Sequence, residues 1–353
     1  MEPGIGDFQQ GLLRRAGAGA SLDPDERAAL AEWLLTDPTQ TGFFGVTAAN
    51  SGRVVAERLR ALPGAVASLS APLCVAGYEE RVECPAEELL RFQLPLAQLL
   101  LARAADGAGR MVVAIAGLPA GGKSVFAAVM ARVAEALKVS EGIAALRQAQ
   151  GGHERRRMAA ISSDTLRAPF GIVAVGLDGY HYPNAHLLSH PAPPGLPEQG
   201  PLKLYKGAHF TFDAARLAAD LRRLRAASGP VSLPAYDRTI HDPVEGRIVV
   251  APGDQLVLVE GNYLLYRRNG WENLDGLFDL GIYLDLPPRV NREPMIARHM
   301  RGGRGRQDAE RHFERADRLN TELVAATRAE ADIVVELSER YAVTAILRGA
   351  RRR

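Results

Sequence analysis

The chain contains little cysteine and little lysine. Its two cysteines, Cys74 and Cys84, have neither metal-site nor redox spacing, and 353 residues with so few thiols do not make a disulfide scaffold. A reducing, cytoplasmic compartment is therefore expected. Only four of the 43 basic residues are lysines, so each lysine is a position to inspect. They are Lys123, Lys138, Lys203 and Lys206.

Long apolar runs are also missing. No stretch approaches the roughly 18 residues of a membrane span, and the first residues lack a basic segment followed by an apolar one. The formal net charge of +2 demands neither nucleic acid nor an anionic membrane as a partner. With 47% hydrophobic and 24% charged residues, the composition predicts a globular protein with one large domain and an extension.

The first 70 residues have a helical pattern of their own. Residues 21–26 carry a helix start signal, and an apolar face follows them. We predict that residues 1–70 form a helical N-terminal extension for packing or partner contact, and that residues 71–353 form the main domain. In that domain, a short hairpin is expected around Gly77, followed by an amphipathic helix over residues 85–104.

Short apolar runs alternate with helical segments through the main domain. The runs cover residues 111–116, 172–177, 256–260, 280–284 and 333–335. Continuous apolar runs of this length are typical of strands buried on both faces, so the pattern predicts a three-layer α/β sandwich with a mainly parallel sheet. A polar insert at 147–169, with Arg155, Arg156 and Arg157, is expected to be a solvated loop; anion binding is the alternative.

A glycine-rich loop follows the first of these runs and precedes a helix. The nine residues that we assign to nucleotide binding are Gly117, Leu118, Pro119, Ala120, Gly121, Gly122, Lys123, Ser124 and Val125. Strand, GxxxxGKS loop and helix together predict a phosphate-binding P-loop, also called Walker A. Lys123 is expected to contact the β and γ phosphates of ATP, and the Ser124 hydroxyl to bind Mg²⁺.

Two carboxylates follow later strands. Asp178 lies at the carboxyl end of the second run, where α/β sheets bind ligands, and is our candidate general base for an acceptor hydroxyl. An Asx turn is the structural alternative. Glu260 ends the third run and is the candidate Mg²⁺-associated acid, since a buried carboxylate without a cation is costly. The nearby His181, His186 and His190 lack the fixed spacing of a helix-borne zinc motif.

Four further motifs occur in order behind the P-loop. They are DGYHYPN from Asp178, KGAHFTFD from Lys206, PAYDRTIHDPVEG from Pro234 and VEGNYLLY from Val259. Together they resemble the phosphoribulokinase, uridine kinase and pantothenate kinase superfamily, and most closely its bacterial nucleoside/nucleotide or fructose-transport-system kinase branch. The similarity covers about residue 71 to the C-terminus. His209 replaces the proline of the family's KGAP stretch, which leaves the acceptor open.

The resemblance implies roles for further residues. It implies that the acceptor is bound by Tyr180, His181, Lys206, Tyr236, Asp237, Arg238 and His241. For the Tyr236 segment, a loop packed by that ring is the alternative. It also implies an arginine-bearing lid at about residues 290–310 that closes over the phosphates. Of the five arginines there, we expect Arg298 and Arg301 to be catalytic, and the rest to belong in part to a solvated helix.

These observations predict an ATP- and Mg²⁺-dependent small-molecule kinase that phosphorylates an alcohol. A sugar, a nucleoside and a pantothenate-like compound all remain open as acceptors. The alternatives are a P-loop NTPase acting as a nucleotide-driven switch and a regulatory partner-binding protein. We expect neither nucleic acid nor a membrane as a partner, and leave a homodimer open.

Overall fold

The computed structural model describes residues 6–75, 78–107, 109–145 and 171–351. The polar insert at 147–169 lies outside these residues, and so does Gly77 in the predicted hairpin. The strands on either side of Gly77, β1 (Leu73–Val75) and β2 (Tyr78–Glu80), pair in antiparallel register as expected.

Six strands form the central sheet, in the order β10-β9-β8-β3-β7-β4. Five of them run parallel and β10 is antiparallel at one edge. Their bounds are β3 (Met111–Gly117), β4 (Gly171–Gly176), β7 (Asp254–Glu260), β8 (Leu280–Asp285), β9 (Ile333–Leu337) and β10 (Val343–Arg348). The five predicted strands and the mainly parallel sheet are thus confirmed.

The apolar runs are continuous because both faces of the sheet are covered. In β3, Val113 and Ile115 belong to one hydrophobic cluster, while Val112 and Ala114 belong to another. Alternate side chains of a strand point to opposite faces, so a strand between two helical layers needs an apolar residue at every position. The first cluster includes α5 (Leu94–Asp106) and α6 (Lys123–Ala145), and the second includes α8 (Ala214–Ala226) and α11 (Arg318–Ala326).

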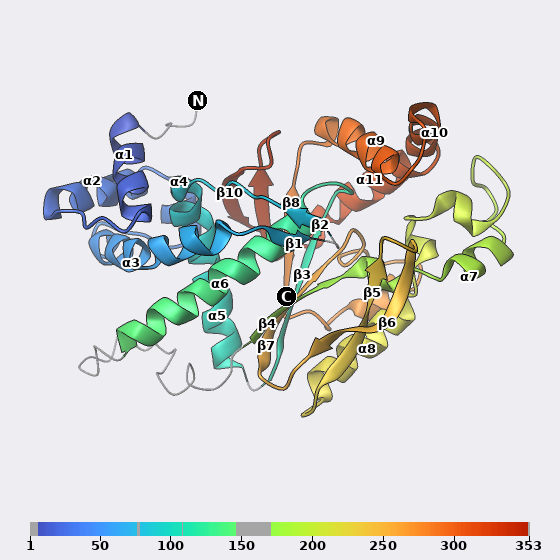
Figure 1. Ribbon diagram of the computed structural model, residues 1–353, viewed down its shortest axis with the longest axis horizontal. Helices are drawn as coiled ribbons and strands as arrows, with labels where there is room; N and C mark the ends of the chain where they lie inside the picture. Colours follow the sequence, from blue (N-terminus) through green and yellow to red (C-terminus); the bar gives the residue numbers. More distant parts are fainter. Residues whose placement is uncertain (1–5, 76–77, 108, 146–170, 352–353) are drawn as a thin grey trace.

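The N-terminal helices belong to the first cluster. They are α1 (Asp7–Gly17), α2 (Pro24–Leu35) and α3 (Ser51–Leu69), and they lie at the left end of the molecule in Figure 1. The start signal forms a capping box, in which the Asp23 carboxylate accepts from the Glu26 backbone N–H at 2.8 Å. The predicted helix at 85–104 is divided into α4 (Ala86–Glu88), a π-helical turn and α5. The domain boundary at residue 70 stays a prediction.

The elements that surround the ends of β4 and β7 lie outside the sheet. They are α7 (Asn184–Ser189), the antiparallel hairpin of β5 (Val231–Asp237) and β6 (Asp242–Val250), α9 (Arg292–Arg301) and α10 (Arg306–His312). Figure 1 shows the hairpin and α9–α11 at the end of the molecule opposite α1–α3. The hairpin and β10 were not predicted. Within the described residues, no helix has both the length and the apolar character needed to cross a membrane.

Candidate active site

The predicted P-loop connects the end of β3 to the start of α6. Its backbone needs small residues: a Cβ on Gly117 would lie 2.8 Å from the carbonyl oxygen of Leu284 in β8. Ala120 and Gly122 have φ values of +55° and +79°, in the left-handed region. The loop therefore turns tightly at the N-terminus of a long helix, where backbone N–H groups and the helix dipole favour an anion.

Lys123 is buried beneath this loop. Its ammonium donates to the Leu118 carbonyl oxygen at 2.6 Å, and its residue is 7% exposed. Burial lowers the pKa of Lys123 to about 8, with the nearby Glu260 opposing that effect. An anionic group on the loop would favour the protonated lysine, which is the behaviour expected of a phosphate ligand.

Ser124, in the first turn of α6, meets Glu260 at the end of β7. The Ser124 hydroxyl donates to a carboxylate oxygen of Glu260 at 2.8 Å, because Glu260 ends β7 and β7 pairs with β3. Burial raises the pKa of Glu260, while Lys123 opposes the rise. A hydroxyl and a buried carboxylate side by side are oxygen ligands of the kind that Mg²⁺ takes, so the two residues fit the predicted metal site.

Asp178 lies just past β4, in a short 3-10 turn, and its side chain is 32% exposed. Its carboxylate is 3.2 Å from Arg238 of the hairpin and 3.4 Å from Arg298 of α9. Burial alone would raise the pKa of Asp178, but the surrounding cations, Arg298 foremost, more than offset this and lower it. Burial also lowers the pKa of His181 to about 4, so at neutral pH the arginines and Lys123 carry the effect.

The predicted acceptor residues are brought together only in part. Tyr236 lies between two cations, with the Lys206 ammonium 5.0 Å and the Arg238 guanidinium 5.7 Å from its ring centre. His181 packs its buried ring on Phe212 at 3.8 Å between centres, and lies 5.6 Å from Tyr236. His181 and Arg238 thus lie beside the Asp178 carboxylate, with Tyr236 and Lys206 next to them.

Three predicted acceptor residues point elsewhere. The buried Tyr180 donates its hydroxyl to Asp220 of α8 at 3.1 Å, since the turn after β4 sends its side chain into the core. The Asp237 carboxylate accepts hydrogen bonds from the Thr239 backbone N–H and the Arg247 guanidinium, both in the same hairpin. His241 has an exposed side chain and contributes its backbone carbonyl, which accepts from Lys206 at 2.9 Å. Tyr180 thus points into the core, Asp237 bonds within the hairpin and His241 faces solvent; acceptor binding by these three residues stays a prediction.

The two expected lid arginines also differ. Arg298 reaches Asp178, whereas Arg301, the last residue of α9, is exposed. Of the pair, the described structure brings only Arg298 into contact with Asp178.

Lys203 and Asn184, which lie beside Lys206, were missed by sequence reasoning. The ammonium groups of Lys203 and Lys206 both donate to the side-chain oxygen of Asn184, at the start of α7; the Lys206 distance is 2.8 Å. Burial and, after it, the charge of the neighbouring Lys203 lower the pKa of Lys206 to about 8. The scarcity of lysine was the signal that could have found Lys203.

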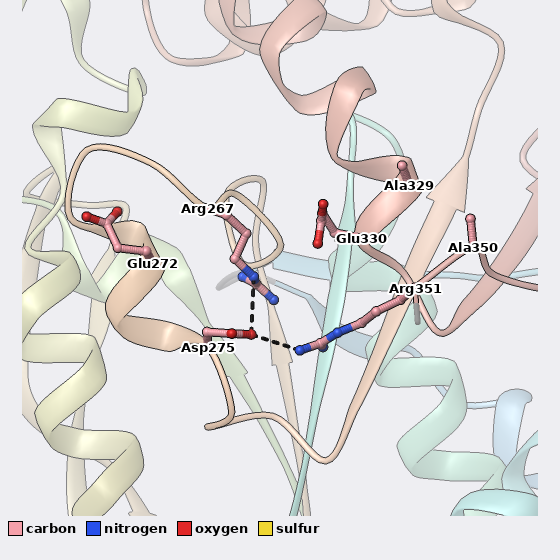
Figure 2. A pocket seen from close by; sticks show the side chains of 7 residues that line it. All are labelled: Arg267, Glu272, Asp275, Ala329, Glu330, Ala350 and Arg351. Atoms are coloured by element: carbon pink, nitrogen blue, oxygen red, sulfur yellow. Dashed lines mark hydrogen bonds and ion pairs between the residues drawn. The ribbon is translucent and has the colours of Figure 1, made fainter. Parts of the chain in front are cut away.

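A cavity of about 500 Å³ lies elsewhere in the molecule (Figure 2). Its lining residues precede β8 and β9 or follow β10. The cavity therefore lies at the amino ends of the parallel strands, opposite the P-loop. Its two arginines, Arg267 and Arg351, both pair with Asp275, as Figure 2 shows. We place the candidate active site at the P-loop instead, because it follows the carboxyl end of β3 and ligands of open α/β sheets bind at the carboxyl ends of the strands.

A phosphate loop between a buried parallel strand and a helix, with acids at the ends of the neighbouring strands, defines a P-loop nucleotide-binding protein. No family model matches the chain. The uncharacterized protein YggC of Escherichia coli K12 is 37% identical over 169 residues, which are 48% of this chain and 65% of YggC. An ATP-dependent kinase-like protein, notR', of Aspergillus versicolor is 34% identical over 131 residues, 36% of this chain and 73% of its own length.

Among solved structures, a candidate fructose transport system kinase from Silicibacter sp. TM1040 aligns with a TM-score of 0.53 and 24% identity. The alignment covers 70% of this chain and 98% of that one, and it shows a shared fold. The chain belongs to the phosphoribulokinase/uridine kinase/pantothenate kinase-like P-loop kinases. The predicted family and fold class are confirmed.

Proposed function

We propose that the protein is an ATP- and Mg²⁺-dependent kinase that transfers a phosphoryl group to an alcohol, with Asp178 as the general base. The observation that carries this proposal is the convergence of Lys123, Glu260 and Asp178 at the ends of three neighbouring strands. The first two serve the donor nucleotide and its metal. The third is an ionised carboxylate beside Arg238 and Arg298.

The transfer follows from these positions. The acceptor oxygen attacks the γ-phosphorus, the bond between that phosphorus and the β–γ bridging oxygen breaks, and ADP leaves. The acceptor proton passes to a carboxylate oxygen of Asp178. Mg²⁺ on Ser124 and Glu260 supplies charge neutralisation at the phosphates when bound.

Arg298 gives the lid two roles in this proposal. On α9 it pairs with Asp178 and holds the pKa of that carboxyl down. A guanidinium at this position can turn to the γ-phosphate when ATP binds, where it stabilises the charge of the transition state. Its departure would make Asp178 a stronger base at the moment when the acceptor proton must be taken.

The lysine pair favours an acceptor that carries a negative charge. Lys203 and Lys206 share one amide oxygen, burial lowers the pKa of both ammonium groups, and the positive charge of Lys203 adds to the lowering at Lys206. Asp242 is the carboxylate that opposes this effect at both lysines. A carboxylate or phosphate on the acceptor would relieve the repulsion while its hydroxyl faces Asp178, which fits a pantothenate-like compound or a sugar phosphate better than a neutral sugar or nucleoside.

The test of the base is acceptor-dependent ADP release. A panel of charged and neutral alcohols identifies the acceptor, and Asp178→Asn is then expected to lower kcat by about 10²- to 10⁴-fold while ATP binding changes little. Asp275→Asn, in the cavity at the amino ends of the parallel strands, is the matched control and should keep full activity. Full activity of Asp178→Asn would refute the assignment, and ADP release that no alcohol stimulates would favour a nucleotide-driven switch.

The acceptor class has its own test. The test compares a charged acceptor with its uncharged counterpart, either ribose 5-phosphate with ribose or pantothenate with panthenol. In the pair that the enzyme phosphorylates, we expect the charged compound to be preferred. Lys203→Gln should remove this preference by weakening only the charged member of the pair. An equal effect on both members would contradict a role in binding the charge.

A further inference from the structure

Tyr341 has a backbone conformation that tyrosine rarely adopts. It closes the turn between β9 and β10 with a φ of +65°, and its N–H donates to the Ser338 carbonyl oxygen at 2.9 Å. The left-handed position of such a hairpin loop usually holds glycine, because the Cβ of an L-residue is crowded there. A bulky residue at a strained position is a reason to look for a function of its side chain.

The other non-glycine residues with positive φ support this reading. Among the described residues they are Ala120, His241 and Asn269. Ala120 lies in the P-loop, and the His241 carbonyl accepts from Lys206. Asn269 is of the residue type that tolerates this region best. Two of the three thus belong to the active site.

The ring of Tyr341 lies against the P-loop. A Cβ added to Gly122 would be 3.2 Å from the Cδ1 atom of Tyr341, and Gly122 directly precedes Lys123. The residue is nevertheless 37% exposed, and it counts among the exposed large apolar residues. The ring therefore contacts the phosphate loop and still offers surface to a ligand.

The strand order places this ring on the side of the P-loop away from Asp178. β3, which carries the P-loop, lies in the middle of the sheet, and β7 and β4, which precede Glu260 and Asp178, lie on one side of it. β8 and β9 lie on the other side. Tyr341 follows β9, so it lies at the carboxyl ends of the parallel strands, as the P-loop does. If the γ-phosphate faces Asp178, the opposite end of the nucleotide extends over β8 towards β9.

We propose that Tyr341 forms the nucleobase subsite, with its ring stacked on the planar base of the bound nucleotide. The inference rests on nucleotide binding at the P-loop and is independent of the acceptor. Stacking on an aromatic ring depends on the π-face that every base has, so this subsite contributes affinity for the base without choosing among bases. The strained turn is the means of holding the ring beside Gly122.

The test compares ligands with and without a base. Binding of MgATP and of magnesium tripolyphosphate to the full chain is measured by calorimetry for the wild type, Tyr341→Gly and Tyr341→Phe. Tyr341→Gly should weaken ATP binding about 5- to 100-fold, the range of base–aromatic stacking, and leave tripolyphosphate binding unchanged within about twofold. Tyr341→Phe should match the wild type for both ligands.

Thermal unfolding of Tyr341→Gly separates the subsite from a structural role. Because glycine relieves the positive φ, the apo variant should melt at the same or a higher temperature than the wild type. Equal weakening of both ligands would show that the ring only supports the P-loop, and unchanged ATP binding would show that it does not touch the base; either result overturns the proposal. A wild type that binds neither ligand would instead refute nucleotide binding itself.

Discussion

Arg238 and Arg298 form a matched pair of cations on Asp178, which allows the two roles of the lid arginine to be separated. Their guanidinium groups lie 3.2 and 3.4 Å from the same carboxylate oxygen, one from the hairpin and one from α9. At such distances two unit charges interact by about 1 kcal/mol in water and about 5 kcal/mol at an effective dielectric of about 20. Since Asp178 is 32% and Arg298 40% exposed, the screened value of about 1 kcal/mol applies.

Removing either arginine should therefore make Asp178 a weaker acid by roughly fivefold. The assay is the pH dependence of kcat/KM for acceptor-dependent ADP release, whose acid limb reports the base in the free enzyme. Arg238→Met and Arg298→Met should both move this limb to higher pH. Only Arg298→Met should also lower kcat at neutral pH, by up to about 10³-fold or more if the arginine stabilises the transferring phosphoryl group. Equal kcat values in the two variants would refute the phosphate-binding role of Arg298, and an unmoved limb in both would refute the identification of Asp178 as the base.

Three further outcomes are expected. Arg110 is 8% exposed and donates to four backbone carbonyl groups, those of Leu224, Ala227, Gly229 and Ala251, so Arg110→Met should lower the free energy of unfolding by about 3–5 kcal/mol in a urea titration. Because the pKa of Lys206 is lowered to about 8, its charge is present below that pH and lost above it, and the KM of a charged acceptor should rise between pH 7.5 and 9 while that of an uncharged acceptor stays level. Glu260→Gln should raise the Mg²⁺ concentration for half-maximal activity by about tenfold with full ATP binding retained, and an unchanged Mg²⁺ requirement would remove Glu260 from the metal site.

The parallel strands could be predicted because burial on two faces requires a continuous apolar run, and β3, β7 and β8 each contain one. The hairpin β5–β6 gave no such signal. It packs one side against the core and exposes the other, Pro234 interrupts it with a register shift, and its motif was read as an acceptor-binding loop. β10 is a short antiparallel edge strand with two exposed residues at its end, so its pattern was equally weak.

The residues of the candidate site divide in the same way. Lys123, Ser124 and Glu260 could be predicted because strand ends and a helix start fix where their side chains go. Tyr180 was misplaced because adjacency to Asp178 in the chain does not imply a shared direction, and the 3-10 turn sends the two side chains apart. Lys203 and Asn184 could not be paired from sequence, since their contact depends on how α7 packs on a loop 19 residues later.

Among the described residues, the hairpin is a separate two-stranded sheet that does not pair with the six-stranded one, although it carries Tyr236 and Arg238 to Asp178. The donor machinery, by contrast, is built into the central strands. If the hairpin binds the acceptor as proposed, an insertion, deletion or replacement in it would change what is phosphorylated without unpairing a strand of the central sheet. For an engineer, as for evolution, β5–β6 is an exchangeable part, and grafting the corresponding segment of a relative onto this chain is a direct route to a new acceptor.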